Sequence, residues 1–576
     1  MDLATLHAST RIAYVRFVGS FFNKTHHHQR HKDCGILVLL SATNYGLIDR
    51  IVYLVTEARS PLKLAAFLVL WSVSILALVT VALERRTGLR CAWAFVIAAG
   101  TTAAVAYRHV ADSDLTSVEM MTLWHVRHEA GRAFQAYWSL SLAAGLVFIA
   151  TITLFAWPPR PTSLFQWPRR LVGVLPILPI GLCFSMLLME GGRRLTALPQ
   201  QFAQAANFLF VGSRIMTTTL PTRSPVEMAA GPELAKRIVL IVDESIRADY
   251  ISLSPGNSAT PHLADHRARF VDFGPAASGG NCSASSNAIL RFTATRHDLP
   301  RSVQTSPSIW RYAKQAGYRT VYIDGQSSHI RMLGAVGGRS KLQNHMSLAE
   351  TLDIDDLHTF DDVPDSDADQ KVAEIIAREI KADEKVFVYA NKNGAHFPYE
   401  NAYPRRNPDP SSSPDTSPQR TLLDHYRNAV FHSVSQFFKT FFDSADLRDS
   451  VVFYTSDHGQ RLQSGKTSHC NVIDPDAREA LVPLLVAASD ARLQGQFRKG
   501  AEINLGRADH FAIIPSVLYT MGYPLNDVLA HYGSSMLTLI ETTPSFTSGD
   551  VMGGIGDGVH WHAIDLTGDF LEPETE

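Results

Sequence analysis

Long uncharged apolar stretches occupy much of the first 195 residues and set the strongest limit on the fold. A helix needs about 20 apolar residues to cross a bilayer, and four stretches approach or reach that length without a charge. A fifth is interrupted by Asp49 and Arg50 near one end, and Pro176 and Pro179 are expected to kink the last. The sequence therefore predicts a membrane domain at 35–195 with about five helices. The five stretches are Gly35–Val55, Leu64–Leu83, Cys91–Tyr107, Trp138–Trp157 and Leu171–Met189.

Lysine and arginine are concentrated at one side of these predicted helices, and such loops stay in the cytoplasm. This pattern predicts a cytoplasmic tail at 1–34 and an outside location for everything after residue 195. Repeated apolar stretches without a small-residue cleavage site argue against a signal peptide. The basic residues are Arg11, Arg16, Lys24, Arg30 and Lys32 before the first stretch, Arg85, Arg86 and Arg90 after the second, and Arg160, Arg169 and Arg170 after the fourth.

The chain changes character after residue 195. Residues 196–236 are polar and broken by Pro221 and Pro225, which predicts an interfacial linker with a short amphipathic helix at Leu198–Phe210. A second domain is expected at 237–525, and the acidic, Gly/Thr-rich residues 526–576 are expected to form a peripheral tail. A net charge of −2 and the lack of a basic tract with interleaved aromatics argue against a nucleic-acid partner.

Apolar runs alternate with helical patterns from residue 237, which predicts an α/β domain with a mostly parallel sheet between helices. Ile238–Val242 is an unbroken run of β-branched and leucine residues, typical of a strand that is buried on both faces. Further strands are expected at Thr320–Ile323, Lys385–Tyr389 and Val451–Tyr454. The carboxyl ends of parallel strands lie along one edge of a sheet, where ligands bind.

Three of these strands are followed by side chains that can bind a metal ion. Asp243 and Glu244 follow the first, His396 comes shortly after the third, and Asp457 and His458 follow the fourth. A divalent cation needs carboxylates and neutral imidazoles from several segments. The pattern predicts a metal site, although any one of these histidines alone is more often structural. The predicted metal ligands are Asp243, Glu244, Asp457 and His458, with His469 in the following loop as a further candidate.

A glycine-rich approach at Ser278-Gly-Gly-Asn-Cys282 leads into a helical pattern that begins near Ala284. Cys282 and Ser283 are thus expected at a helix N-terminus, where free amides and the helix dipole favour a phosphate or sulfate group. The simpler interpretation is that the serine caps the helix.

At this point the residues resemble the alkaline-phosphatase/sulfatase superfamily. The five apolar stretches ahead of this domain are similar to the bacterial inner-membrane phosphoethanolamine transferases that modify lipid A and other envelope glycans. Asp243-Glu-Ser-Ile-Arg247 resembles that family's Gly-Glu-Thr-x-Arg motif at Glu244 and Arg247. The superfamily motifs are Ala259-Thr-Pro-His-Leu263, Cys282-Ser-Ala-Ser-Ser286, Ala316-Gly-Tyr-Arg319, His396-Phe-Pro-Tyr399, Ser456-Asp-His-Gly459, Val482-Pro-Leu-Leu485 and Asp509-His510 ahead of Ile514-Pro-Ser-Val-Leu518.

The resemblance implies a nucleophile at the start of the helix but leaves two candidates. Cys282 falls in the nucleophile position of sulfatases, yet Ser286 stands where their maturation signal needs arginine. A metal-bound serine alkoxide at Ser283 is the usual phosphoryl acceptor in the superfamily, while a Cys282 thiolate would hold zinc tightly. Cys282 and Cys470 are the two cysteines expected outside the membrane, and a disulfide between them would leave Ser283 as the nucleophile.

The resemblance further implies a metal-dependent transferase in the bacterial inner membrane, with its catalytic domain in the periplasm. It would move phosphoethanolamine from phosphatidylethanolamine to a glycan or lipid A through a covalent phospho-enzyme. Zinc is the expected metal, with manganese or magnesium as alternatives. Arg247, His396 and His469 are expected to stabilise the phosphate or move protons. The alternatives are a membrane-tethered sulfatase or phosphodiesterase, a metal-free lipid-sensing module, and a transferase of glycerol phosphate.

Overall fold

The computed structural model forms two compact units. The first comprises Met1–Met121, Tyr137–Thr218 and Gly554–Gly558, and the second comprises Thr122–Ala136, Thr219–Gly553 and Val559–Glu576. Residues 1–26 of the predicted tail 1–34 lie outside the described residues, as do Arg160, Arg169 and Arg170, while residues 27–34 belong to a helix that begins at His27. The structure describes residues 27–570 except 45, 112, 126, 128–129, 160–172, 193–196, 218–220, 255–257, 327–349, 351, 361–362, 382–383, 405–417, 556–557 and 569.

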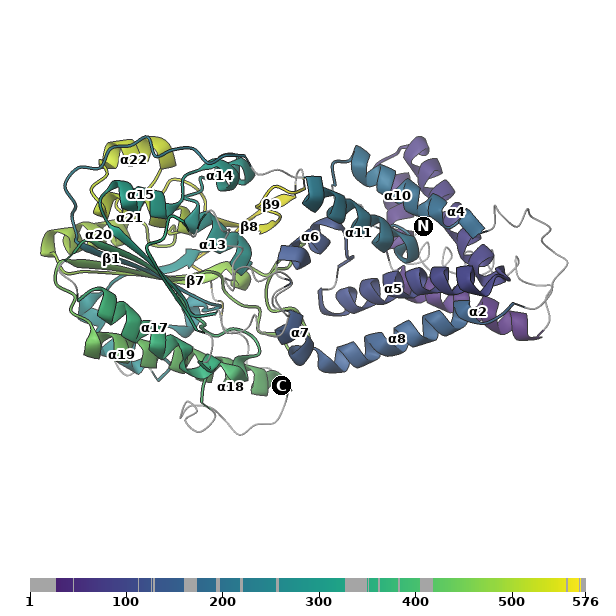
Figure 1. Ribbon diagram of the computed structural model, residues 1–576, viewed down its shortest axis with the longest axis horizontal. Coiled ribbons are helices and arrows are strands. Elements are labelled where there is room, and N and C mark those ends of the chain that lie inside the picture. The colour runs from purple at the N-terminus through teal and green to yellow at the C-terminus, as the bar shows by residue number, and fades with distance from the viewer. Residues whose placement is uncertain are drawn as a thin grey trace. The chain divides into compact units, whose positions relative to one another are not determined.

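The first unit is helical throughout its described secondary structure (Figure 1). Two short helices, α6 (Ser117–His125) and α7 (Ala130–Ala136), follow α5 in the chain. The helices of the unit are α2 (His27–Thr43), α3 (Leu47–Thr56), α4 (Pro61–Leu83), α5 (Thr87–Ala111), α8 (Trp138–Ala156), α10 (Ile177–Met189) and α11 (Gln200–Thr217).

Three helices of the described residues, α4, α5 and α8, are long and apolar enough to cross a membrane. The first predicted span is instead a bent pair, Cys34–Thr43 and Leu47–Thr56, with an angle of 62° between its halves. The last predicted span contains helix α10 after Pro176, which has 13 residues, or roughly 20 Å at 1.5 Å per residue. The count of five spans therefore stays a prediction.

Two features of this unit were not predicted from the sequence. Helix α5 starts at Thr87 instead of Cys91, because Arg90 is buried and donates to the carbonyls of Glu84 and Ala156, each at 2.9 Å. Helix α11, expected to be short and interfacial, has 18 residues and packs against α5 and α10. Most of the predicted linker is therefore part of the helical unit.

The second unit contains a seven-stranded sheet with the order β2-β7-β6-β1-β5-β3-β4. Strands β1, β3, β4, β5 and β6 are mutually parallel, and β7 runs antiparallel to both β6 and β2. The predicted α/β fold with a mostly parallel sheet is confirmed. The strands are β1 (Arg237–Asp243), β2 (Val271–Ala277), β3 (Arg319–Asp324), β4 (Asp356–Thr359), β5 (Val386–Asn391), β6 (Ser450–Ser456) and β7 (Leu481–Ala488).

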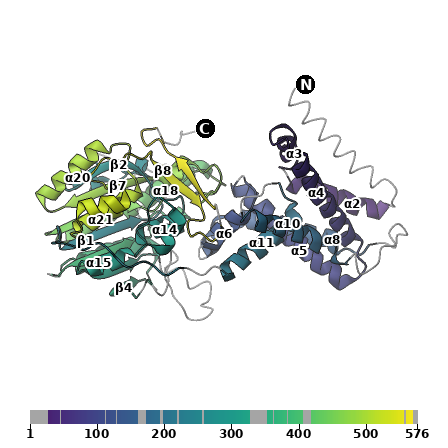
Figure 2. The ribbon, with the colours of Figure 1, turned by 90° about the horizontal axis from the view of Figure 1, so that it is seen from above.

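Both faces of this sheet are covered by helices, so each face has its own hydrophobic core (Figures 1 and 2). Because side chains alternate along a strand, Ile238 and Leu240 enter one core while Val239 and Ile241 enter the other. The first face is covered by α15 (Ile309–Gln315), α20 (Ala491–Ile503), α21 (Ile513–Thr520) and α22 (Leu525–Tyr532), and the second by α17 (Asp365–Glu379), α18 (Pro418–Val430) and α19 (Phe437–Ser444).

The residues after 525 do not form the peripheral tail that was expected. Met536 and Ile540 are fully buried in the first core, and β8 (Ser545–Gly549) pairs with β9 (Val559–Ala563) in an antiparallel hairpin. Acidic and Gly/Thr-rich composition concealed this role, because a few buried apolar residues are enough to anchor such a segment.

Candidate active site

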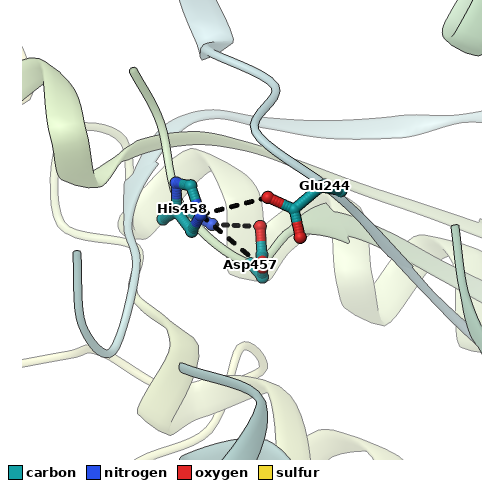
Figure 3. Close-up of side chains that lie close together, drawn as sticks. All are labelled: Glu244, Asp457 and His458. Atoms are coloured by element: carbon teal, nitrogen blue, oxygen red, sulfur yellow. Dashed lines mark hydrogen bonds and ion pairs between the residues drawn. The ribbon is translucent and has the colours of Figure 1, made fainter. Parts of the chain in front are cut away.

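The carboxyl ends of the central neighbours β1 and β6 carry a compact cluster of Glu244, Asp457 and His458 (Figure 3). All three side chains are fully buried, and one potential ligand atom from each lies within 4.8 Å of the others. The register of the two strands brings them together, since Asp243 pairs with Ser456, Glu244 and Asp457 follow directly, and His458 comes one residue later. The predicted convergence of distant segments is therefore present in the structure.

Neighbouring groups orient the ligand atoms. Nδ1 of His458 lies 2.7 Å from the carbonyl oxygen of Gly459, while its Nε2 lies 3.1 Å from Oε1 of Glu244. A ring fixed through one nitrogen presents the other to a metal. The Glu244 carboxylate accepts hydrogen bonds from Ser245 Oγ at 2.6 Å and from Gln326 Nε2 at 2.9 Å.

The electrostatics of the cluster fit a bound cation. Burial and the nearby Glu244 carboxylate raise the pKa of Asp457 well above its usual range. Burial lowers the pKa of His458, but Asp457 and Glu244 outweigh that effect and raise it to about 10. Two buried carboxylates thus draw positive charge to the site, which a divalent ion would supply. Two carboxylates and one imidazole also match a zinc donor set.

Ser283 is the first residue of α13 (Ser283–Arg291), close to the predicted start at Ala284. Its Oγ lies 3.0 Å from His458 Nε2 and 3.1 Å from Glu244 Oε2. The first amides of a helix have no intrahelical acceptor and favour an anion. A hydroxyl, the metal-capable cluster and a helix N-terminus therefore meet at one point.

Cys282, the other candidate nucleophile, forms a disulfide with Cys470. Its sulfur is therefore not a thiolate, and the expectation that Cys282 serves as nucleophile is wrong for this oxidised state. The cross-link joins the residue before Ser283 to the residue after His469. A backbone hydrogen bond of 2.9 Å from Cys470 to the Asn281 carbonyl runs beside it.

The two predicted auxiliary histidines lie on different loops: His469 is on the loop between β6 and β7, and His396 is on the loop after β5. The ring of His469 stacks on that of His458, with 4.3 Å between ring centroids, and its Nδ1 lies 2.9 Å from Ser468 Oγ. His396 follows β5, and its Nδ1 lies 2.7 Å from the Phe397 carbonyl. The amide of Ala395 donates to the Glu244 carbonyl at 3.0 Å, which anchors the His396 loop at the end of β1.

Asp243 does not join the metal-capable group, in contrast to the prediction. Its Oδ2 accepts from Lys392 Nζ at 2.5 Å and from Tyr454 Oη at 2.9 Å, and its Oδ1 accepts from the Glu244 amide. Successive side chains of a strand point to opposite faces, so Asp243 and Glu244 separate. Asp243 is the partner of a fully buried lysine.

Arg247 makes contacts that the sequence analysis did not predict. Its guanidinium forms two hydrogen bonds with the Asp249 carboxylate and donates to the Phe570 carbonyl at 2.7 Å. The expected role of Arg247 toward a phosphate stays a prediction. In the sequence, the acid Asp249 two residues after Arg247 was the feature that could have indicated this ion pair.

Two polar residues near the site were missed by the sequence analysis. Gln326, which holds Glu244, follows β3 by two residues and obeys the same strand-end rule as the acids. His510 contacts Ser286 Oγ on α13 at 3.0 Å and Thr455 Oγ1 on β6 at 3.1 Å. The Asp509-His510 motif pointed to this position in the sequence, but it did not indicate which residues His510 contacts.

The fold and this cluster define an α/β domain of the sulfatase type. The family model described as Sulfatase matches residues 236–523, so the chain belongs to the sulfatase family. Two Kdo(2)-lipid A phosphoethanolamine 7''-transferases, from Salmonella typhimurium and Escherichia coli, are each 21% identical to it over 316 and 318 residues. These matches cover 50% of this chain and 51% and 52% of the relatives, so the chain spans about half the length of the relatives it matches.

The similarity in three dimensions extends over more of the chain. The integral membrane protein lipooligosaccharide phosphoethanolamine transferase A (EptA) from Neisseria meningitidis superposes with a TM-score of 0.58. The superposition covers 84% of this chain and 94% of that protein at 15% identity. At this identity the match shows the fold, a helical unit followed by a sulfatase-like domain.

Proposed function

We propose that this protein is a metal-dependent membrane phosphoethanolamine transferase that uses Ser283 as its nucleophile. The observation that carries the proposal is the position of Ser283 Oγ, 3.0 Å from His458 Nε2 at the N-terminus of α13. The relatives named as lipid A phosphoethanolamine transferases supply the substrate class. The donor is phosphatidylethanolamine, and the acceptor is a hydroxyl or phosphate of an envelope glycan or lipid A.

Glu244, Asp457 and His458 would hold the metal ion, and zinc suits their mixture of oxygen and imidazole ligands better than magnesium does. Once bound, such an ion lowers the pKa of a nearby hydroxyl and offsets charge on phosphoryl oxygens. Gln326 and the Gly459 carbonyl keep the Glu244 and His458 side chains in place for this purpose.

In the first step, Ser283 Oγ gives up its proton toward Glu244 Oε2, which accepts a hydrogen bond from it at 3.1 Å, and bonds to the phosphorus of phosphatidylethanolamine. The bond from phosphorus to the diacylglycerol oxygen breaks, and that oxygen takes up a proton. His469, stacked on His458, is the candidate donor. The α13 N-terminus stabilises the negative oxygens in the transition state. Phosphoethanolamine remains covalently attached to Ser283.

In the second step, an acceptor oxygen attacks the same phosphorus and loses its proton. The bond to Ser283 Oγ breaks, and the serine recovers a proton as the modified acceptor leaves. The helical unit fits a lipid donor, because α4, α5 and α8 have the length and composition of membrane spans. The Cys282–Cys470 disulfide supports a periplasmic location for the second unit, since disulfides persist in oxidising compartments.

The test uses the purified full-length chain in detergent with phosphatidylethanolamine, in the presence and absence of Kdo(2)-lipid A. The expected result is diacylglycerol release together with phosphoethanolamine on the acceptor. Stoichiometric free phosphoethanolamine whether or not acceptor is present would instead identify a hydrolase. Diacylglycerol release that is unaffected by removal of the metal would contradict the metal-dependent mechanism.

A further inference from the structure

The β8–β9 hairpin contacts the loop that precedes the nucleophile Ser283, where Gly280 forms a bridge with Thr547 of β8. The amide of Asn281 donates to the Thr547 carbonyl at 3.0 Å, and Thr547 Oγ1 donates to the Gly279 carbonyl at 2.7 Å. Thr547 pairs across the hairpin with Trp561. Directly opposed residues of antiparallel strands lie about 5 Å apart between Cα atoms. Trp561 is therefore separated from the Ser283 loop by a single strand.

Trp561 belongs to an aromatic and cationic surface at this edge. Its side chain is 41% exposed, which is unusual for a tryptophan of a folded domain. The Arg296 guanidinium lies 5.2 Å from the Trp561 ring centroid and 4.7 Å from that of Phe511. Arg296 is fixed there by Asp509 at 2.8 Å and by Ser545 Oγ at 2.7 Å.

Arg296 and Phe511 line one part of an open groove with a volume of about 890 Å³. Its lining combines cations, an aromatic ring and several hydroxyls, with carboxylates of Asp298 and Glu541 as hydrogen-bond acceptors. Arg301 is exposed in it, and Nε of Arg296 has no hydrogen-bond partner among the described residues. The further lining residues with cationic, aromatic or hydroxyl side chains include His297, Arg301, Ser302, Tyr532 and Thr538.

We propose that this groove, together with Trp561, binds the phosphorylated sugar of the acceptor glycolipid. The proposal rests on the proposed transferase function and assigns a place to its second substrate. Sugar rings present C–H faces that pack on an exposed indole, and their hydroxyls and phosphates suit the hydroxyls and arginines of the groove. Phosphatidylethanolamine has no ring to stack, so these features distinguish the acceptor from the donor.

The groove and the loop before Ser283 both contact strand β8. Arg296 contacts Ser545 at one end of β8, and Thr547, two residues further, contacts the loop before Ser283. Two strand residues span about 7 Å. Strand β8 thus connects the groove at Arg296 to the loop before Ser283, and the proposal places the sugar beside this strand.

The test compares Trp561→Ala, Trp561→Phe and Arg301→Ala with the wild-type full-length chain, and uses Kdo(2)-lipid A as the probe. Arg498→Ala is the matched control, because Arg498 is also an exposed arginine but lies on α20. Two readouts are needed: the rate at which phosphatidylethanolamine labels Ser283, and the KM for the acceptor in complete turnover. Only the second readout involves the groove.

Trp561→Ala and Arg301→Ala are expected to raise the acceptor KM about fivefold to tenfold and to leave the labelling rate unchanged. Trp561→Phe should recover most of the affinity, and Arg498→Ala should match the wild type. Normal labelling with an unchanged acceptor KM in both alanine variants would overturn the groove proposal. Normal labelling of the wild type without saturable use of Kdo(2)-lipid A would also overturn it. Absence of labelling in the wild type would contradict the proposed function itself.

Discussion

Ser283 Oγ lies 3.0 Å from His458 Nε2, although 175 residues separate the two in the chain. The contact joins the N-terminus of α13 to the carboxyl end of strand β6. Glu244, which follows β1, accepts a hydrogen bond from the same serine hydroxyl. A serine at this point is more than a helix cap, because its hydroxyl faces buried groups able to hold a metal ion.

Loss of a ligand should remove the metal. Glu244→Gln and Asp457→Asn each take one negative oxygen from the three-residue group, and the affinity for zinc should fall by more than about tenfold. Elemental analysis of the purified full-length variants measures the effect. Wild-type protein treated with a chelator and reloaded with zinc, manganese or magnesium serves as the control. Full zinc content in both variants would show that the ion binds elsewhere.

Asp243 should be needed for stability and not for metal binding. In Asp243→Asn the buried Lys392 loses its close carboxylate partner and keeps the Asp369 carboxylate, at 3.4 Å, and the Ser433 carbonyl. Breaking a buried pair in this way typically costs about 3 kcal/mol or more, so the thermal unfolding midpoint should fall. The zinc content of the protein that remains folded should not change. An unchanged midpoint combined with lost zinc would reverse the two roles.

The cysteines should contribute through their cross-link. The double variant Cys282→Ala/Cys470→Ala removes a disulfide between residues 188 positions apart, and such losses typically reduce stability by about 2–5 kcal/mol. Thermal unfolding of the variant and of the wild type, with and without reductant, measures this. Reductant should lower the wild-type midpoint toward that of the variant and leave the variant unaffected. Equal midpoints throughout would show that the disulfide has no stabilising role.

His510 should make the second unit sensitive to acid. Burial lowers the pKa of His510 to about 3, against 6.5 for an exposed imidazole. Between about pH 3 and pH 6.5, His510 is therefore protonated in the unfolded chain and neutral in the folded chain. Stability is complete above pH 6.5 and falls below it, by as much as about 1.4 kcal/mol per pH unit. His510→Gln should flatten this slope in unfolding midpoints measured from pH 7.5 to pH 5. Parallel curves for variant and wild type would contradict the assignment.

The α/β fold of the second unit could be predicted from sequence because its central strands are buried on both faces. Ile238–Val242 has no polar residue to obscure the pattern, and the acids that follow it mark the ligand edge. The direction of β7 could not be predicted, since antiparallel central strands have the same apolar composition. The ends of the predicted membrane helices are harder to predict, because a charged residue can lie inside a helix. Arg90 was placed outside the predicted span but is a buried residue of α5.

The site was predicted where chemistry and position agree, as for Glu244, Asp457 and His458. The prediction was wrong for Asp243, because no spacing rule identifies Lys392 as its partner. Lys392 follows a strand like many surface lysines, and only the fold shows it buried against Asp243. The contribution of β8 and β9 was also hidden, since two short strands far from the motifs in sequence carry no chemical signature.

Intact-mass analysis after incubation with phosphatidylethanolamine tests the central claim most directly. The wild-type chain and the Cys282→Ala/Cys470→Ala variant should each gain the mass of one phosphoethanolamine group. Ser283→Ala should gain none, and its transfer rate should fall by about 10³-fold or more. An adduct that persists in Ser283→Ala would contradict the account.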